Sequence, residues 1–167
     1  MPAFIRQRTK KSQLGLIPRQ NQSAERVGDE ALREREVQLL FAGEQFRRAI
    51  GSYYEASPGS VKQYPRRLED LLDDSRFVGR RRHLRKIYRD PMSGRAEWGI
   101  VRAPDGGLAG VYSRSEAKPL KTAGFATGQD AFNGAERYSA WEFIYRPVAR
   151  EFKPATNSSA LGTMPAR

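Results

Sequence analysis

Few side chains in this sequence combine the types and the spacing that covalent catalysis requires. The only histidine, His83, lies within the basic segment RRRHLRK. A histidine that acts as a general base needs a nucleophile beside it and, in triads, an acidic group that orients the ring. Neither stands near His83 in the sequence, so we predict a solvent-exposed histidine on a basic surface rather than a general base.

Four carboxylates precede this segment, and paired carboxylates can act as general acid and base. They are Glu69, Asp70, Asp73 and Asp74, and they are interspersed with Leu68, Leu71 and Leu72. This spacing is typical of the solvent-facing side of a short amphipathic helix. The sequence also has no glycine-rich phosphate loop and no cysteine, so it predicts neither an enzyme nor a protein that holds a cofactor.

A loop further along the chain offers the oxygen ligands that Ca²⁺ prefers. The residues are Gln129, Asp130, Asn133 and Glu136. Only two of them are carboxylates, and their order does not match an EF-hand loop. We interpret them as ordinary loop polarity and keep calcium as the alternative cofactor.

The strongest charge feature is a run of cations with no acidic residue among them. It comprises Arg80, Arg81, Arg82, Arg85, Lys86 and Arg89, in a chain of formal net charge +11 and isoelectric point near 10.3. Such a run could neutralise phosphates, contact anionic lipid or dock on an acidic protein. Aromatic residues that could stack on bases are missing from the run itself, although Phe77 and Tyr88 flank it. We therefore do not expect nucleic acid to be the main partner.

These side chains must be positioned by a few elements, of which a helix over residues 29–57 is the longest. Leu32, Leu39, Phe46 and Tyr53 recur every seven residues, which predicts one apolar face of a helix. The segment SPGS at residues 57–60 ends it. A helix of this length measures about 40 Å, which is more than a small domain needs, so we expect part of it to project.

A second, short helix is expected after Tyr64, with Pro65 at its first position. The segment RDPMSG at residues 89–94 is typical of a turn. Three strands are predicted next: EWGIVRA and LAGVYS, joined by the hairpin signal PDGG, and then AWEFIYR. One long helix and three antiparallel strands make an α+β domain in which the sheet covers the apolar face of the helix.

The domain organisation follows from where the apolar periodicity begins and ends. Residues 1–28 are rich in arginine and lysine, and residues 149–167 have no periodic apolar pattern. We predict that both are disordered tails, because neither can bury enough apolar surface to offset the entropy of ordering. The domain is predicted to span residues 29–148, with a stalk helix over 29–57 and a globular α/β part over 58–148.

Ordered motifs across the predicted domain resemble a known family. The stretches are REREVQLLFAGEQFRRAIGSYYEASPG, QYPRRLEDLLDD, RRRHLRKIYRDPMSGRAEWGIVRAPDGGLAGVYS and PLKTAGF, within residues 30–147. They are similar to the periplasmic part of type II secretion system pseudopilins, and more narrowly to prepilin-like relatives of the major pseudopilin. The most specific part is a Tyr-Pro before a Leu-rich helix, then Tyr-x-Asp-Pro-x-x-Gly, then a hairpin that bears a tryptophan.

The resemblance implies a pilin-like fold, in which a long N-terminal helix packs on a small antiparallel sheet of about three strands. It also implies a structural subunit that stacks with other pseudopilins and secretion-apparatus components into a short periplasmic filament. Assembly with copies of itself and a location in the inner membrane, facing the periplasm, are implied as well. The residues that build the domain would be Tyr64, Pro65, Asp90, Pro91, Gly94 and Trp98.

The N-terminal segment departs from the family pattern. Pseudopilins have a basic leader that ends in glycine, followed by about twenty apolar residues that anchor the subunit in the membrane. Here RQRTKKSQLG resembles such a leader, but the following LIPRQNQSAERVGDE is polar and has Gln20 where the family has a glutamate. The hydrophobic half of the helix is missing and we find no transmembrane or secretory signal, so we expect the chain as given to be soluble.

Two functional hypotheses follow from these observations. The first is a structural pseudopilin-like subunit of a type II protein secretion apparatus, which acts by helical packing and not by catalysis. The alternative is a basic binding module that contacts nucleic acid or anionic lipid through Arg80–Arg89. A hydrolase is a third reading only if the structure brings polar groups together in a concave site.

Overall fold

The computed structural model describes residues 19–147, and the disorder expected for residues 1–18 and 149–167 lies outside this part. Its long helix is α1 (Arg19–Glu55), and its strands are β1 (Gly99–Arg102), β2 (Leu108–Tyr112) and β3 (Phe143–Ile144). Three short 3-10 helices lie in the connections: η1 (Glu69–Leu71), η2 (Asp130–Phe132) and η3 (Tyr138–Ala140). The predicted α+β composition is confirmed.

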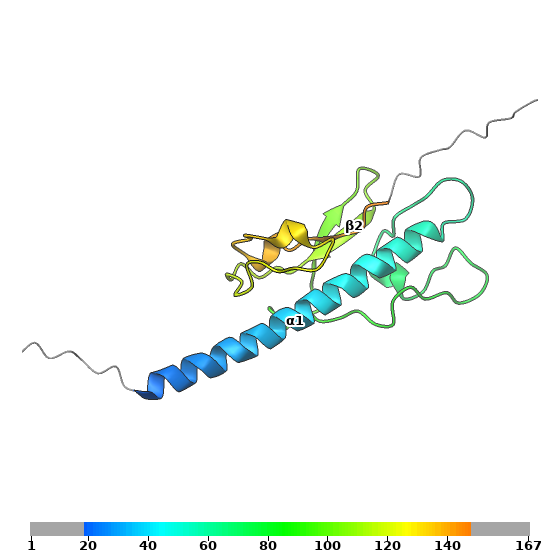
Figure 1. The fold of residues 1–167 in the computed structure, drawn as a ribbon. Helices are drawn as coiled ribbons and strands as arrows, with labels where there is room; N and C mark the ends of the chain where they lie inside the picture. Colours follow the sequence, from blue (N-terminus) through cyan, green and yellow to red (C-terminus); the bar gives the residue numbers. More distant parts are fainter. Residues whose placement is uncertain (1–18, 148–167) are drawn as a thin grey trace, which may run out of the picture.

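The three strands form an antiparallel sheet in the order β1-β2-β3 (Figure 1). The predicted hairpin joins β1 to β2: the Asp105 carboxylate accepts a hydrogen bond from the Gly107 N–H at 2.9 Å, and Gly106 has a φ of +80°. Glycine adopts such a φ at little steric cost, which explains its presence in this turn.

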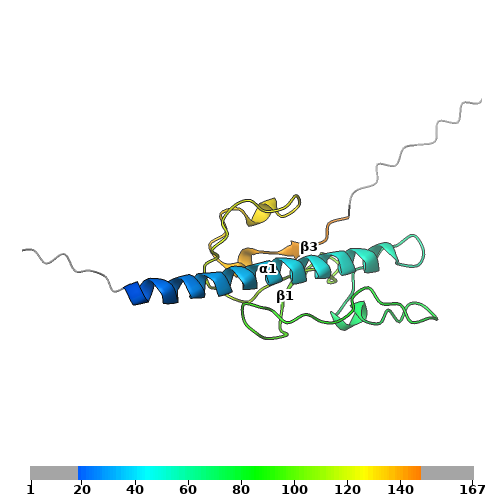
Figure 2. The same ribbon diagram turned by 60° about the horizontal axis from the view of Figure 1, so that its bottom comes forward.

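The apolar face of α1 packs on β2 and β3 (Figure 2). The residues predicted from the seven-residue spacing are the buried ones: Leu39 and Phe46 are fully buried and Tyr53 is 8 % exposed. The sheet contributes Val111 and Phe143, which are also buried. Each large apolar side chain buried in this way contributes roughly 1.5–3 kcal/mol, so this layer holds the sheet against the helix.

Two glycines of α1 determine how closely the helix approaches β3. A Cβ atom added at Gly43 would overlap the ring of Phe143, and one added at Gly51 would overlap the ring of Tyr145. The aromatic rings therefore occupy space that any larger residue on the helix would fill. This close contact explains the use of glycine inside a helix, where it costs about 0.5–1 kcal/mol relative to alanine.

α1 begins at Arg19 rather than at residue 29, and it ends at Glu55 rather than at residue 57. The helix thus includes residues 19–28, which the sequence had assigned to a disordered tail. No proline interrupts the chain between Pro18 and Pro58, and Gln, Ala, Glu and Arg are good helix formers. The charge that suggested a tail does not oppose a helix.

The N-terminal part of α1 extends away from the rest of the domain (Figure 1). Residues 26–31 are all exposed, and from residue 26 onwards Leu32 is the first to pack against the core. At 1.5 Å per residue, the segment over residues 19–31 is about 20 Å long. We call it the projecting segment. Within residues 19–147, no helix is both long enough and apolar enough to cross a bilayer.

The predicted second helix is reduced to the single turn η1. The Asp70 carboxylate accepts hydrogen bonds from the N–H groups of Arg66 and Arg67, both at 3.0 Å. The chain then leaves helical geometry, because the Asp74 N–H bonds to the Arg81 carbonyl at 2.9 Å rather than to a residue four positions back. A tertiary contact therefore overrides the apolar spacing that suggested a longer helix.

Candidate functional site

The six cations predicted as a docking patch lie on a loop after η1, which we call the basic loop (residues 76–89). Arg80, Arg81, Arg82, Arg85, Lys86 and Arg89 are all exposed. None of them forms an ion pair with a carboxylate in residues 19–147. Their charges face solvent and can interact with an external anion.

The base of the basic loop is held by a buried ion pair between Asp74 and Arg76. The Asp74 side chain is fully buried, and its oxygens accept hydrogen bonds from Nε and Nη2 of Arg76 at 2.8 and 2.7 Å. The same guanidinium donates to the Ser57 hydroxyl and to the Tyr53 carbonyl, both at 2.8 Å. The Tyr53 carbonyl belongs to the last turn of α1, so the ion pair fastens the loop to the end of the helix.

His83 joins the same cluster, and the prediction of an exposed histidine is wrong. Its side chain is 1 % exposed, Nε2 lies 3.1 Å from the Asp74 carboxylate, and Nδ1 lies 2.8 Å from the Ser52 hydroxyl. Ser52 stands 31 positions before His83 in the sequence, so only the tertiary fold brings them together. For the same reason Asp74, which was expected on the solvent side of a helix, is buried.

The order Ser52, His83, Asp74 is that of a catalytic triad, in which a carboxylate orients an imidazole that takes a proton from a serine. However, the carboxylate already accepts hydrogen bonds from Arg76. These bonds are the main reason why the pKa of Asp74 is lowered to about 2. Ser52 also lies inside α1, where the backbone N–H groups are bonded along the helix and do not form an oxyanion hole. The arrangement instead holds the basic loop against the C-terminal end of α1.

A second buried polar cluster connects α1 to the segment around η3. Glu36 is 3 % exposed, and its Oε1 accepts hydrogen bonds from the N–H groups of Leu120 and Lys121 at 2.7 and 3.1 Å. The Tyr138 hydroxyl donates to the same oxygen at 2.9 Å. Burial, followed by this hydrogen bond to Glu36, raises the pKa of Tyr138 well above its usual value. The phenol therefore stays a hydrogen-bond donor at neutral pH.

The Asp-Pro motif forms a turn whose carboxylate is buried. The Asp90 carbonyl accepts the Gly94 N–H at 2.7 Å, and Gly94 has a φ of +71°. The two Asp90 carboxylate oxygens accept hydrogen bonds from the Met92 N–H at 2.9 Å and from the Ser113 hydroxyl at 2.8 Å. Ser113 directly follows β2, so this turn is attached to the end of the central strand. Pro91, within the turn, is half-buried.

Trp98 attaches the start of β1 to the helix. It is 6 % exposed, and its ring centroid lies 5.1 Å from that of Phe46 in an edge-to-face arrangement. Its Nε1 donates a hydrogen bond to the Tyr88 carbonyl at 2.8 Å. The ring is part of the core and also holds the segment before the Asp-Pro turn.

The Tyr-Pro motif comes before η1 in the sequence and contacts different partners. The carbonyl of the buried Pro65 accepts a hydrogen bond from the Leu108 N–H at 2.7 Å. The Tyr64 hydroxyl donates to the Tyr145 carbonyl at 3.3 Å. The motif residues therefore join loops to strands and do not converge on one site.

Two of the four residues considered for calcium, Asp130 and Asn133, form hydrogen bonds within their own loop. The Asp130 carboxylate accepts the Gly128 N–H at 3.2 Å, and the Asn133 amide donates to the Asp130 carbonyl at 2.8 Å. Throughout the described range, residues 19–147, no group of three or more His, Cys, Asp or Glu side chains is arranged to hold a metal ion.

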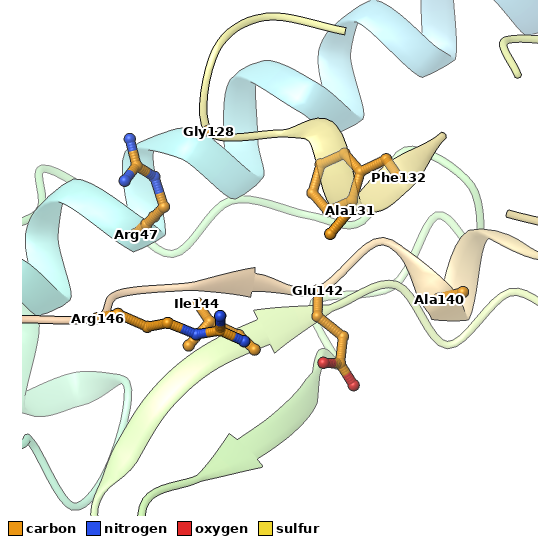
Figure 3. A pocket seen from close by; sticks show the side chains of 8 residues that line it. All are labelled: Arg47, Gly128, Ala131, Phe132, Ala140, Glu142, Ile144 and Arg146. Carbon is orange, nitrogen blue, oxygen red and sulfur yellow. The ribbon is translucent and has the colours of Figure 1, made fainter. Parts of the chain in front are cut away.

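A pocket of about 400 Å³ lies between η2 and β3 (Figure 3). Its lining residues are Arg47, Gly128, Ala131, Phe132, Ala140, Glu142, Ile144 and Arg146. These side chains include no hydroxyl, thiol or imidazole, so the pocket offers no nucleophile. Of its two arginines, Arg47 is paired with Glu44 at 2.7 Å.

Sequence reasoning missed the partners that complete the two polar clusters, namely Ser52, Arg76, Glu36 and Tyr138. One signal was available for Glu36, which lies on the apolar face of the helix three residues before Leu39. A carboxylate in such a position is buried only where hydrogen bonds satisfy it. No local signal distinguishes Ser52 from the other polar residues of α1.

The structure thus provides a cationic loop on a rigid base and a helix with one covered and one projecting part. These two features, rather than the pocket, are available for contacts with other molecules. No protein-family model matches the chain, and the curated proteins and the solved structures gave no match either.

Proposed function

We propose that this chain is a structural, pseudopilin-like subunit of a type II protein secretion apparatus, located at the inner membrane and facing the periplasm. Its partners are other pseudopilins, further components of the apparatus and copies of itself. It acts by packing its helix against neighbouring subunits, in a pilin-like fold, and not by catalysis. The order of the Tyr-Pro, Asp-Pro and tryptophan motifs along the sequence suggests this family.

The observation that carries the proposal is the division of α1 into a covered and a projecting part. Leu39 and Phe46 are fully buried against the sheet, whereas residues 26–31 are exposed. The exposed residues continue a helix whose remaining part is already anchored, so the segment is presented in helical form without a partner inside the chain over residues 26–31. An exposed, preformed helical segment of this kind is suited to packing against another subunit.

The two buried polar clusters support the same role. The Asp74–Arg76 ion pair and the hydrogen bonds of Glu36 are each closed by partners within the chain. Closed networks of this kind rigidify a domain and fix one arrangement of its loops. A filament subunit needs such rigidity because its contacts repeat from one copy to the next.

Deleting the gene in the source organism and following a secreted protein tests the proposal. The secreted protein should accumulate in the periplasm and return to the medium when the gene is restored. Val27 and Val61 provide a matched pair, because they are 69 % and 68 % exposed and only Val27 lies on the projecting segment. Val27→Arg should fail to restore secretion, and Val61→Arg should restore it. Normal secretion in the deletion strain would overturn the proposal.

A further inference from the structure

The basic loop has an apolar tip, which the proposed function does not use. Val78 is fully exposed, and Arg80, Arg81 and Arg82 follow it after a single glycine, Gly79. Three further cations of the loop, Arg85, Lys86 and Arg89, are exposed as well, whereas Arg76 is paired with Asp74. An exposed apolar residue flanked by cations is the pattern of a segment that lies in the interface of an anionic membrane.

The loop is held in shape from its base. The Asp74 N–H donates to the Arg81 carbonyl at 2.9 Å, and the N–H groups of His83 and Leu84 both lie 2.9 Å from the Leu71 carbonyl. The Asp74–Arg76 ion pair then fixes this base to α1. The tip is therefore presented without the entropy cost of ordering a mobile segment.

We propose that the basic loop binds membrane surfaces that contain anionic lipids. In this arrangement Val78 enters the headgroup region, and the surrounding cations contact the lipid phosphates. The first part of the loop lies beside the C-terminal end of α1, and its last residues run back along the helix, where Tyr88 contacts Phe41 and Phe46 (Figures 1 and 2). Lipid binding by this loop does not depend on the pseudopilin role, because it involves only the loop and its base.

The geometry favours lipid over nucleic acid. Single-stranded nucleic acids bind through aromatic side chains that stack on bases. The aromatic ring next to the tip, Phe77, is already covered by the guanidinium of Arg81, whose central carbon lies 4.6 Å from the ring centroid. Valine has no aromatic ring on which a base could stack. Transfer of its side chain from water into the interfacial layer of a membrane is nevertheless favourable.

Co-sedimentation of the full chain with lipid vesicles tests this inference. The chain should bind vesicles of phosphatidylcholine and phosphatidylglycerol and should not bind vesicles of phosphatidylcholine alone. Binding should weaken as sodium chloride is raised, because salt screens the attraction between the cations and the surface. A fluorescent single-stranded oligonucleotide is tested at the same salt concentrations.

Three triple variants locate the contact. R80Q/R82Q/R85Q should reduce partitioning roughly a hundredfold, at about fivefold per cation. R114Q/K118Q/R137Q removes as many charges from exposed positions outside the loop and should change binding little. R6Q/R8Q/K10Q removes the same number from the N-terminal segment and should also change it little.

Val78→Asn tests the apolar tip separately from the charge. It should reduce partitioning about five- to tenfold, whereas Val37→Asn, at a position 66 % exposed on α1, should leave it unchanged. The inference is overturned if phosphatidylcholine alone binds equally well, or if the loop and control variants lose binding alike. It is also overturned if only R6Q/R8Q/K10Q abolishes binding, or if the loop variants lose the oligonucleotide but retain the vesicles.

Discussion

Asp74 and Glu36 are both carboxylates with almost no contact with water, yet different partners stabilise them. Asp74 faces the guanidinium of Arg76, whereas Glu36 faces backbone N–H groups and the hydroxyl of Tyr138. Burying either carboxylate costs free energy unless its hydrogen-bond partners remain in place. Each case leads to its own prediction.

Replacing Asp74 by Asn should change how stability depends on pH. The folded-state pKa of Asp74, about 2, lies below its ordinary value of 3.8. The carboxylate therefore stabilises the fold above about pH 4, and this contribution, about 2 kcal/mol, is lost as the pH falls towards 2. Urea unfolding followed by tryptophan fluorescence should show the stability difference between wild type and Asp74→Asn shrinking by that amount over this range.

Asp73→Asn is the matched control for this measurement. Asp73 is exposed and forms no ion pair with another residue in the range 19–147. Its replacement should leave the pH dependence close to that of wild type. If Asp74→Asn and Asp73→Asn behave alike, the buried ion pair does not stabilise the folded chain.

Replacing Glu36 should distinguish the loss of charge from the loss of an acceptor. Glu36→Ala leaves the N–H groups of Leu120 and Lys121 and the Tyr138 hydroxyl without their acceptor. We expect it to lower the free energy of unfolding by about 3 kcal/mol. Glu36→Gln keeps a carbonyl oxygen at this position and should cost less than half as much. Equal losses for both variants, measured by urea unfolding, would mean that the negative charge itself matters.

At the scale of elements, the contact between α1 and β3 depends on the absence of side chains on the helix. Gly43→Ala places a methyl group against the Phe143 ring, and we expect it to lower the free energy of unfolding by about 1–3 kcal/mol. It should do so although alanine is the better helix former by about 1 kcal/mol. Urea unfolding measures the effect.

Gly28→Ala is the matched control, because a Cβ atom at Gly28 meets no other atom within 4 Å. It should leave the free energy of unfolding unchanged or slightly raised and should increase the helical circular dichroism signal. If Gly43→Ala is as stable as Gly28→Ala, then the helix and β3 are not in close contact in solution.

The elements were also where the sequence was most informative. The spacing of Leu39, Phe46 and Tyr53 gave the buried face of the helix, and the Gly106 turn gave the β1–β2 hairpin. Both signals are local, because helix periodicity and turn geometry depend on neighbouring residues. The start of α1 was placed too late because a charged, polar composition was taken to indicate disorder, although its residues are good helix formers. The second helix was predicted too long because leucine spacing does not include the tertiary hydrogen bond from Asp74 to Arg81.

The candidate site was less predictable than the fold. The exposure of the six cations on the basic loop agrees with what their sequence suggested. The positions of His83 and Asp74 do not, because their partners Ser52 and Arg76 act through contacts that no local pattern encodes. Local charge is visible in a sequence, whereas a buried polar network appears only once the chain has folded.

At the scale of the whole molecule, the chain is a domain of a helix and a small sheet with a helical segment that extends beyond it (Figure 1). The covered part of α1 is stabilised from within the chain, by the sheet and by the polar clusters at Glu36 and Asp74. The projecting segment has no such contacts over residues 26–31. The proposed function assigns this segment to contacts with other subunits.

Cysteine cross-linking in cells tests this assignment most directly, since the chain has no cysteine of its own. Val27→Cys places a thiol on the projecting segment, and Ala123→Cys places one at an exposed position of the globular part. With a bismaleimide reagent and partners that carry cysteines on their helices, Val27→Cys should form adducts with a second copy or with another pseudopilin. Ala123→Cys should remain mostly monomeric. If a Val27→Cys variant that supports secretion gives only monomer, the projecting segment is not a subunit contact and the proposed function is wrong.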